Sequence, residues 1–136
     1  MRLFGLAWSK ADAKHIEQAA AELLAQQRAD GGWAQLSGME SDAYATGQAL
    51  VALHEAKALR GTDKAYQHGV AYLLRTQLAD GSWVVRTRSS PVQQLKDSGF
   101  PHGRDQWISA AGTSWAAMAL ALSQPRAGGQ LLSSLF

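Results

Sequence analysis

Apolar residues recur with a helical period in the first part of the chain. They stand three or four positions apart, which is the spacing of one face of an α-helix, and the stripe comprises Ile16, Ala20, Leu23, Leu24 and Gln27. The opposite face is polar. Ser9, with Asp12 three residues later, predicts the N-terminal cap, and the Asp-Gly-Gly sequence at 30–32 predicts the end. The pattern predicts an amphipathic helix.

A second segment is apolar on all sides. Residues 49–53 read Ala-Leu-Val-Ala-Leu, and a helix that is apolar all round is usually buried. Ser41 and Asp42 predict its start, and Gly61 predicts its end. We therefore expect an inner helix behind the amphipathic one.

An amphipathic helix followed by an apolar helix is then predicted a second time. Thr62 and Asp63 predict the start of a third helix, whose apolar stripe repeats that of the first with Tyr66, Val70, Leu73, Leu74 and Gln77. A fourth, all-apolar helix is expected from about Ile108 to Pro125. Between them, residues 84–106 contain two prolines and two glycines and predict a long loop with one helical turn near 92–96.

The repetition extends to individual residues. The stretch 23–33 recurs at 73–83, fifty positions later, with seven of eleven residues identical. The inner helices match at an offset of sixty-seven, so the second repeat has the longer loop. The sequence predicts one all-α domain over 1–136, with repeat 1 at about 10–60, repeat 2 at about 62–124 and a tail at 125–136, in helix-on-helix layers.

Composition narrows the function classes. Of 136 residues, 46% are apolar and 18% charged, which suits a globular chain. The net charge of +2 is too small for a nucleic-acid footprint. The lack of cysteine excludes disulfides, thiolate catalysis and zinc–thiolate sites. No signal peptide or transmembrane segment is visible, so the compartment, cytoplasmic or extracytoplasmic in a bacterium, stays open.

Each repeat carries what we call a clip, which consists of Gln27, Gly31 and Trp33 in the first copy and of Gln77, Gly81 and Trp83 in the second. Both glutamines lie on apolar stripes, where an unpartnered amide costs about 1–3 kcal/mol. We therefore expect each amide to bond backbone at the next helix start, with the indole folded back over it. Gln77→Ala is then expected to cost about 1–3 kcal/mol.

The Gln-x3-Gly-x-Trp spacing resembles the QW motif of the squalene–hopene and oxidosqualene cyclase superfamily. Gly69, Tyr72 and Leu73 also match its small, aromatic and aliphatic positions, whereas Glu22 replaces the aromatic residue in the first copy. Segments 41–50 and 100–111 look like bacterial squalene-cyclase-like domains, and the likeness covers about 19–123. It implies an α/α toroid, the (α/α)6 barrel, of which two hairpins are present here. The chain is then a fragment or a unit that assembles.

The same resemblance limits the chemistry. Class II terpene cyclases of this superfamily protonate their substrate with a DxDD motif, which this sequence lacks. The prenyltransferases that share the toroid hold zinc with aspartate, cysteine and histidine, and the four histidines here lack metal-ligand spacing. We expect no metal and no cofactor.

The remaining candidate catalytic residues are Asp42, His102 and Asp105, which would be polar groups at a cavity mouth. The favoured alternative is structural: Asp105 caps the fourth helix, His102 bonds local backbone, Trp107 packs in the core and Asp42 serves a helix start. The candidate lining of a central cavity comprises Tyr44, Thr46, Thr113 and Trp115, with core packing as the alternative.

Two functions follow. The first is a structural or binding module with an apolar inner face. Its partner would be another copy, the rest of a longer parent chain or an isoprenoid-like lipid, and not nucleic acid. The alternative is a terpene cyclase of the squalene–hopene type completed by assembly or by missing sequence.

Overall fold

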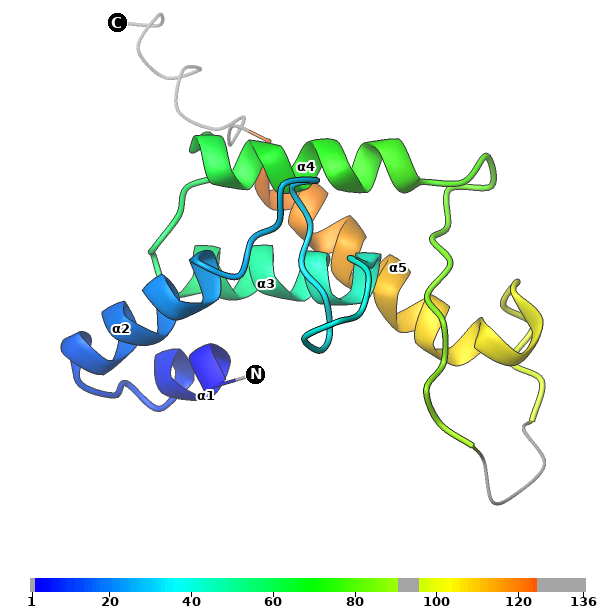
Figure 1. Cartoon of the computed structure of the whole chain (residues 1–136), viewed down its shortest axis with the longest axis horizontal. Coiled ribbons are helices and arrows are strands. Elements are labelled where there is room, and N and C mark those ends of the chain that lie inside the picture. Colours follow the sequence, from blue (N-terminus) through cyan, green and yellow to red (C-terminus); the bar gives the residue numbers. More distant parts are fainter. Residues whose placement is uncertain (1, 91–95, 125–136) are drawn as a thin grey trace, which may run out of the picture.

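The computed structural model describes residues 2–90 and 96–124, in which all regular secondary structure is helical and there is no strand (Figure 1). Their elements are α1 (Arg2–Trp8), α2 (Ala13–Leu24), α3 (Ala43–Glu55), α4 (Lys64–Thr76), the 3-10 turn η1 (Gly103–Asp105) and α5 (Gln106–Leu122). The all-α prediction is confirmed for this part. The predicted turn at 92–96, apart from Lys96, the stop at Pro125 and the tail at 125–136 lie outside the described residues.

The two apolar helices form the centre of the fold. The contact between α3 and α5 is the most extensive between any two elements. It is close because Gly47 has no side chain: a Cβ there would lie 2.6 Å from the backbone nitrogen of Ala116. The backbones of the two inner helices therefore touch at this position.

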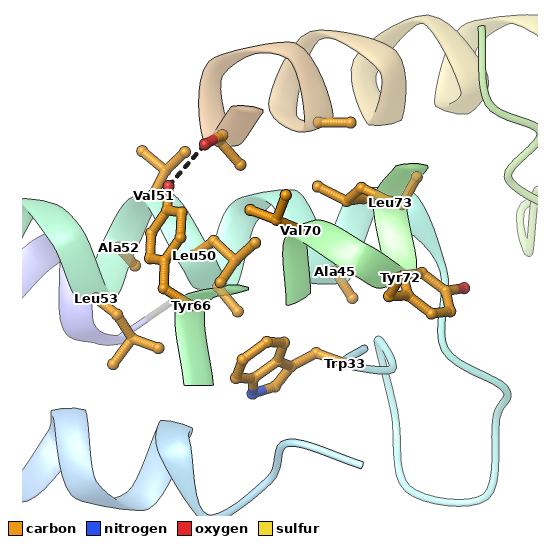
Figure 2. Close-up of a cluster of buried hydrophobic side chains, with 14 of the residues drawn as sticks. Trp33, Ala45, Leu50, Val51, Ala52, Leu53, Tyr66, Val70, Tyr72 and Leu73 are labelled. Carbon is orange, nitrogen blue, oxygen red and sulfur yellow. Dashed lines mark hydrogen bonds between the residues drawn. The ribbon is translucent and has the colours of Figure 1, made fainter. Parts of the chain in front are cut away.

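The helix α4, which corresponds to the third predicted helix, lies along α3 and reaches α5 (Figure 1). Its buried side chains include Tyr66 and Leu73, which pack with Leu50 of α3 (Figure 2). The Tyr66 hydroxyl donates a hydrogen bond to the carbonyl of Ala119, 2.8 Å away. That carbonyl is among the last four of α5, which lack partners within the helix. Burial raises the pKa of Tyr66 to about 12, so the hydroxyl remains a donor at neutral pH.

The helix α1 was not predicted. Leu3 and Phe4 are its buried residues, and it packs against α2 and α3. The prediction that Ser9 caps the next helix is wrong, because its hydroxyl donates to the carbonyl of Leu6 at the end of α1. The helix α2 begins only after Asp12.

Other boundaries shift by a few residues. The cap of α3 is Asp42 and not Ser41, because the Asp42 carboxylate accepts the backbone N–H of Ala45 at 2.8 Å. The Asp-Gly pairs at 30–31 and 80–81 were expected to end the two amphipathic helices. The helices α2 and α4 end before them, at Leu24 and Thr76. The last helix begins at Gln106, two residues before Ile108. Within the described ranges, no helix is long and apolar enough to cross a membrane.

Candidate functional site

The first clip joins an outer helix to an inner one. Trp33 is 2% exposed, and its indole N–H donates to the carbonyl of Leu23, at the end of α2, over 2.8 Å. Its backbone N–H donates to the hydroxyl of Thr46 on α3 over 2.9 Å. One tryptophan therefore bonds to both helices.

The second clip has the same bonds. Trp83 is also 2% exposed, its indole N–H donates to the carbonyl of Leu73 at 2.8 Å, and its backbone N–H donates to Thr113 at 3.1 Å. Gly31 and Gly81 both have a left-handed backbone, with φ of +88° and +84°, which glycine adopts without strain. The two stretches of similar sequence thus have the same local geometry.

The two glutamines differ in their surroundings. The Gln27 amide donates to the carbonyl of Ala65, in the first turn of α4, at 2.8 Å. In the same place a Cβ on Gly31 would lie 2.9 Å from the carbonyl carbon of His68. The first clip therefore rests against α4. Its glutamine bonds to the start of the next outer helix and not to the inner helix.

The expectation for the second glutamine is wrong. Gln77 is exposed, and its amide donates to the carbonyl of Gly81, within its own turn, at 2.9 Å. A Cβ on Gly81 would meet no atom nearer than the Gln77 amide nitrogen, 3.9 Å away. Among the described residues, no helix lies against the second clip as α4 lies against the first.

This difference replaces the earlier expectation for Gln77→Ala. Gln27→Ala is expected to lower the free energy of unfolding by about 1 kcal/mol, because a half-buried hydrogen bond between segments is lost. Gln77→Ala is expected to change it by less than about 0.5 kcal/mol, because the side chain is exposed. Urea unfolding of the two variants measures both, and equal losses would contradict the assigned contacts.

Asp42 is engaged at the start of α3. One carboxylate oxygen accepts the N–H of Ala45, and the other accepts the amide of Gln35 at 2.7 Å. The Gln35 oxygen in turn accepts Nε of Arg88 at 3.2 Å. The carboxylate thus caps a helix and anchors a chain of side chains that reaches the second loop.

His102 and Asp105 lie in a different network. The Asp105 carboxylate does not cap α5 and instead accepts the backbone N–H of Thr87 at 2.8 Å. His102 Nε2 lies 2.8 Å from the hydroxyl of Ser82, which donates to Asp80 at 2.7 Å. The hydrogen bond from Ser82 lowers the pKa of Asp80. Both structural predictions, a cap by Asp105 and a backbone bond by His102, are therefore wrong.

The residues Asp80, Ser82 and His102 do not form a nucleophilic triad. In a triad the histidine lies between serine and carboxylate and takes the serine proton. Here the serine lies between the other two and is buried. The network holds the long loop against the second clip.

The candidate cavity residues have separate positions. Thr46 is buried and Thr113 half-buried, and each accepts the N–H of a clip tryptophan. The Trp115 ring lies 5.5 Å from that of Phe4 in α1, so the unpredicted helix covers it. Tyr44, the remaining candidate lining residue, lines a cavity of the structure.

Trp107 was expected in the core. It is 52% exposed, and its indole N–H donates to the carbonyl of Lys96.

Two neighbouring cavities share Gln35 and Arg88. One, of about 270 Å³, is lined by Trp33, Tyr44 and Gln48 among others. The second, of about 370 Å³, is lined by Arg86 and Trp107. Gln35 and Gln48 belong to neither clip and to none of the predicted apolar stripes, whereas Arg88 lies in the predicted long loop.

Comparisons with protein-family models, with curated proteins and with solved structures find no match to this chain. Within residues 2–90 and 96–124, no three side chains of histidine, aspartate or glutamate gather as metal ligands.

Proposed function

We propose that this chain is a structural, partner-binding module of the α/α type, as its resemblance to squalene-cyclase repeats implies, and that it binds a second copy. The surface that binds is the end of the molecule formed by α4, the second clip and α5, which we call the α4–α5 end. The observation that carries the proposal is the difference between the two clips. The first rests against α4 through Gln27 and Gly31, whereas the matching Gln77 and Gly81 face open space.

The inner helices support the same reading. Gly47, Leu50 and Val51 of α3 are buried. Their counterparts sixty-seven positions later, Ser114, Ala117 and Met118, are exposed. The all-apolar helix α5 thus has an uncovered face at the positions where α3 is covered.

Large exposed apolar side chains concentrate in the second repeat. Five of the seven such residues in the described part belong to it, namely Leu74, Leu78, Val84, Trp107 and Met118. Trp107 is 52% and Met118 43% exposed. Aromatic residues and methionine are enriched in protein interfaces, and large apolar surfaces usually mark binding sites.

The other end of the molecule indicates what the partner is. There α1 packs against α2 and α3, and Glu22, which stands where the second repeat has Tyr72, forms an ion pair with Arg2 at 3.1 Å. Apart from Trp8, which is 70% exposed, this end is polar, and a polar outer face is typical of a capping repeat. Stacking of one α4–α5 end on this cap is therefore disfavoured. A two-fold pairing of two α4–α5 ends covers the apolar surface of both copies.

Sedimentation over a range of protein concentrations tests the proposal. We expect a monomer–dimer equilibrium. Ala117→Glu, which places a charge on the uncovered face of α5, is expected to weaken dimerisation by at least about tenfold. Ala21→Glu makes the same change at an exposed alanine of α2 and is expected to leave the equilibrium unchanged. A monomer at every concentration, or equal dimerisation of the two variants, would contradict the proposal.

A further inference from the structure

A single arginine joins the two neighbouring cavities. Arg88 lines both of them, and so does Gln35. Their volumes are about 270 Å³ and 370 Å³. A small ligand that reaches from one cavity into the other must therefore pass the Arg88 side chain.

The Arg88 side chain is exposed and is linked to α3 through Gln35 and Asp42. Its Nε donates to the Gln35 oxygen at 3.2 Å, and the Gln35 amide donates to Asp42 at 2.7 Å. Asp42 is fixed in turn by the backbone of α3. Among the described residues, this network engages only the Nε–H of the arginine and none of the N–H groups on its two terminal nitrogens. A guanidinium is suited to bind a carboxylate or phosphate through two parallel hydrogen bonds.

The two cavities differ in character. The lining of the larger one includes a second arginine, Arg86, and among the described residues no aspartate or glutamate lines either cavity, while the Asp42 carboxylate lies behind Gln35. The smaller one is lined by the half-buried side chains of Leu23 and Tyr44, with the buried Trp33 and Ala49 behind them. The amides of Gln35 and Gln48 also line it. The anionic group of a ligand would therefore bind the arginines, and its apolar group would contact the neighbouring apolar side chains.

We propose that the two cavities form one binding site for a small amphiphilic anion. Its carboxylate or phosphate binds Arg88, assisted by Arg86, and its apolar part lies against Leu23 and Tyr44. This site is built from the loop that follows each clip and from the start of α3.

Calorimetric titration of the full chain with four probes, each below its micelle concentration, tests the two halves of the site. Octyl phosphate and octanoate carry both groups, octanol lacks the charge and inorganic phosphate lacks the apolar part. We expect at least one of the first two to bind at least about tenfold tighter than octanol and inorganic phosphate. The tighter of the two identifies the anionic group. Equal binding of octanol, or no binding by either anionic amphiphile, would overturn the proposal.

Three variants locate the site. Arg88→Gln is expected to weaken binding of the anionic amphiphile about ten- to a hundredfold. Arg104→Gln removes an exposed arginine from the same long loop but outside both cavities, and it is expected to bind as the unaltered chain does. Gln48→Phe places an aromatic ring in the smaller cavity and is expected to reduce octyl phosphate binding to the level of inorganic phosphate. A folded Arg88→Gln chain with unchanged affinity would overturn the proposal. If that variant does not fold, unchanged binding by Gln48→Phe would do so.

Discussion

Trp33→Ala is expected to lower the free energy of unfolding by about 3–5 kcal/mol, the range for removal of a large aromatic side chain from a core. The indole is 2% exposed and lies among Leu50, Leu53 and Tyr66 of the same core (Figure 2). The substitution also removes the hydrogen bond to Leu23. Part of the loss comes from that carbonyl, which is half-buried at the end of α2.

Urea unfolding followed by circular dichroism measures the effect. The control is Trp107→Ala, since that indole is 52% exposed, and its expected loss is below about 1 kcal/mol. Trp83→Ala is expected to resemble Trp33→Ala because its contacts are the same. Similar losses for Trp33 and Trp107 would contradict the assignment of Trp33 to the core.

Gly31→Ala is expected to cost about 2–5 kcal/mol. About 1–2 kcal/mol arises because φ at this position is +88°, where a Cβ clashes with its own backbone. A further 1–3 kcal/mol, roughly, arises because the new methyl group overlaps the backbone of His68 and pushes the clip away from α4.

Gly81→Ala is the matched control. Its φ of +84° gives the same backbone cost of about 1–2 kcal/mol, but the methyl group would enter open space. The difference between the two losses therefore measures how tightly the first clip is packed against α4. Identical losses, obtained from urea unfolding under the same conditions, would mean that the first clip is as open as the second.

The local geometry of the clips could be predicted from the sequence. Both indoles are buried and both glycines have positive φ, because each of these features depends on residues within a few turns. That the described residues form helices and no strand was predictable for the same reason, because the spacing of apolar residues depends on near neighbours. The position of Asp42 at a helix start was also predictable from residue type.

Features that depend on distant neighbours could not be predicted. Gln27 and Gln77 stand in similar sequences, yet among the described residues only Gln27 bonds to the start of a following helix. The bond between Arg88 and Gln35 joins residues 53 positions apart, and neither lies on a periodic stripe. The helix α1 has only seven residues, which is too short for a hydrophobic period to identify it.

The central claim is that two tryptophans fasten outer helices to inner ones in the same way. Hydrogen exchange of the five indole N–H groups, followed by NMR, tests it most directly. We predict that the indole protons of Trp33 and Trp83 exchange at least about a hundredfold more slowly than that of Trp8, which is 70% exposed. Exchange of either proton as fast as that of Trp8 would contradict the account.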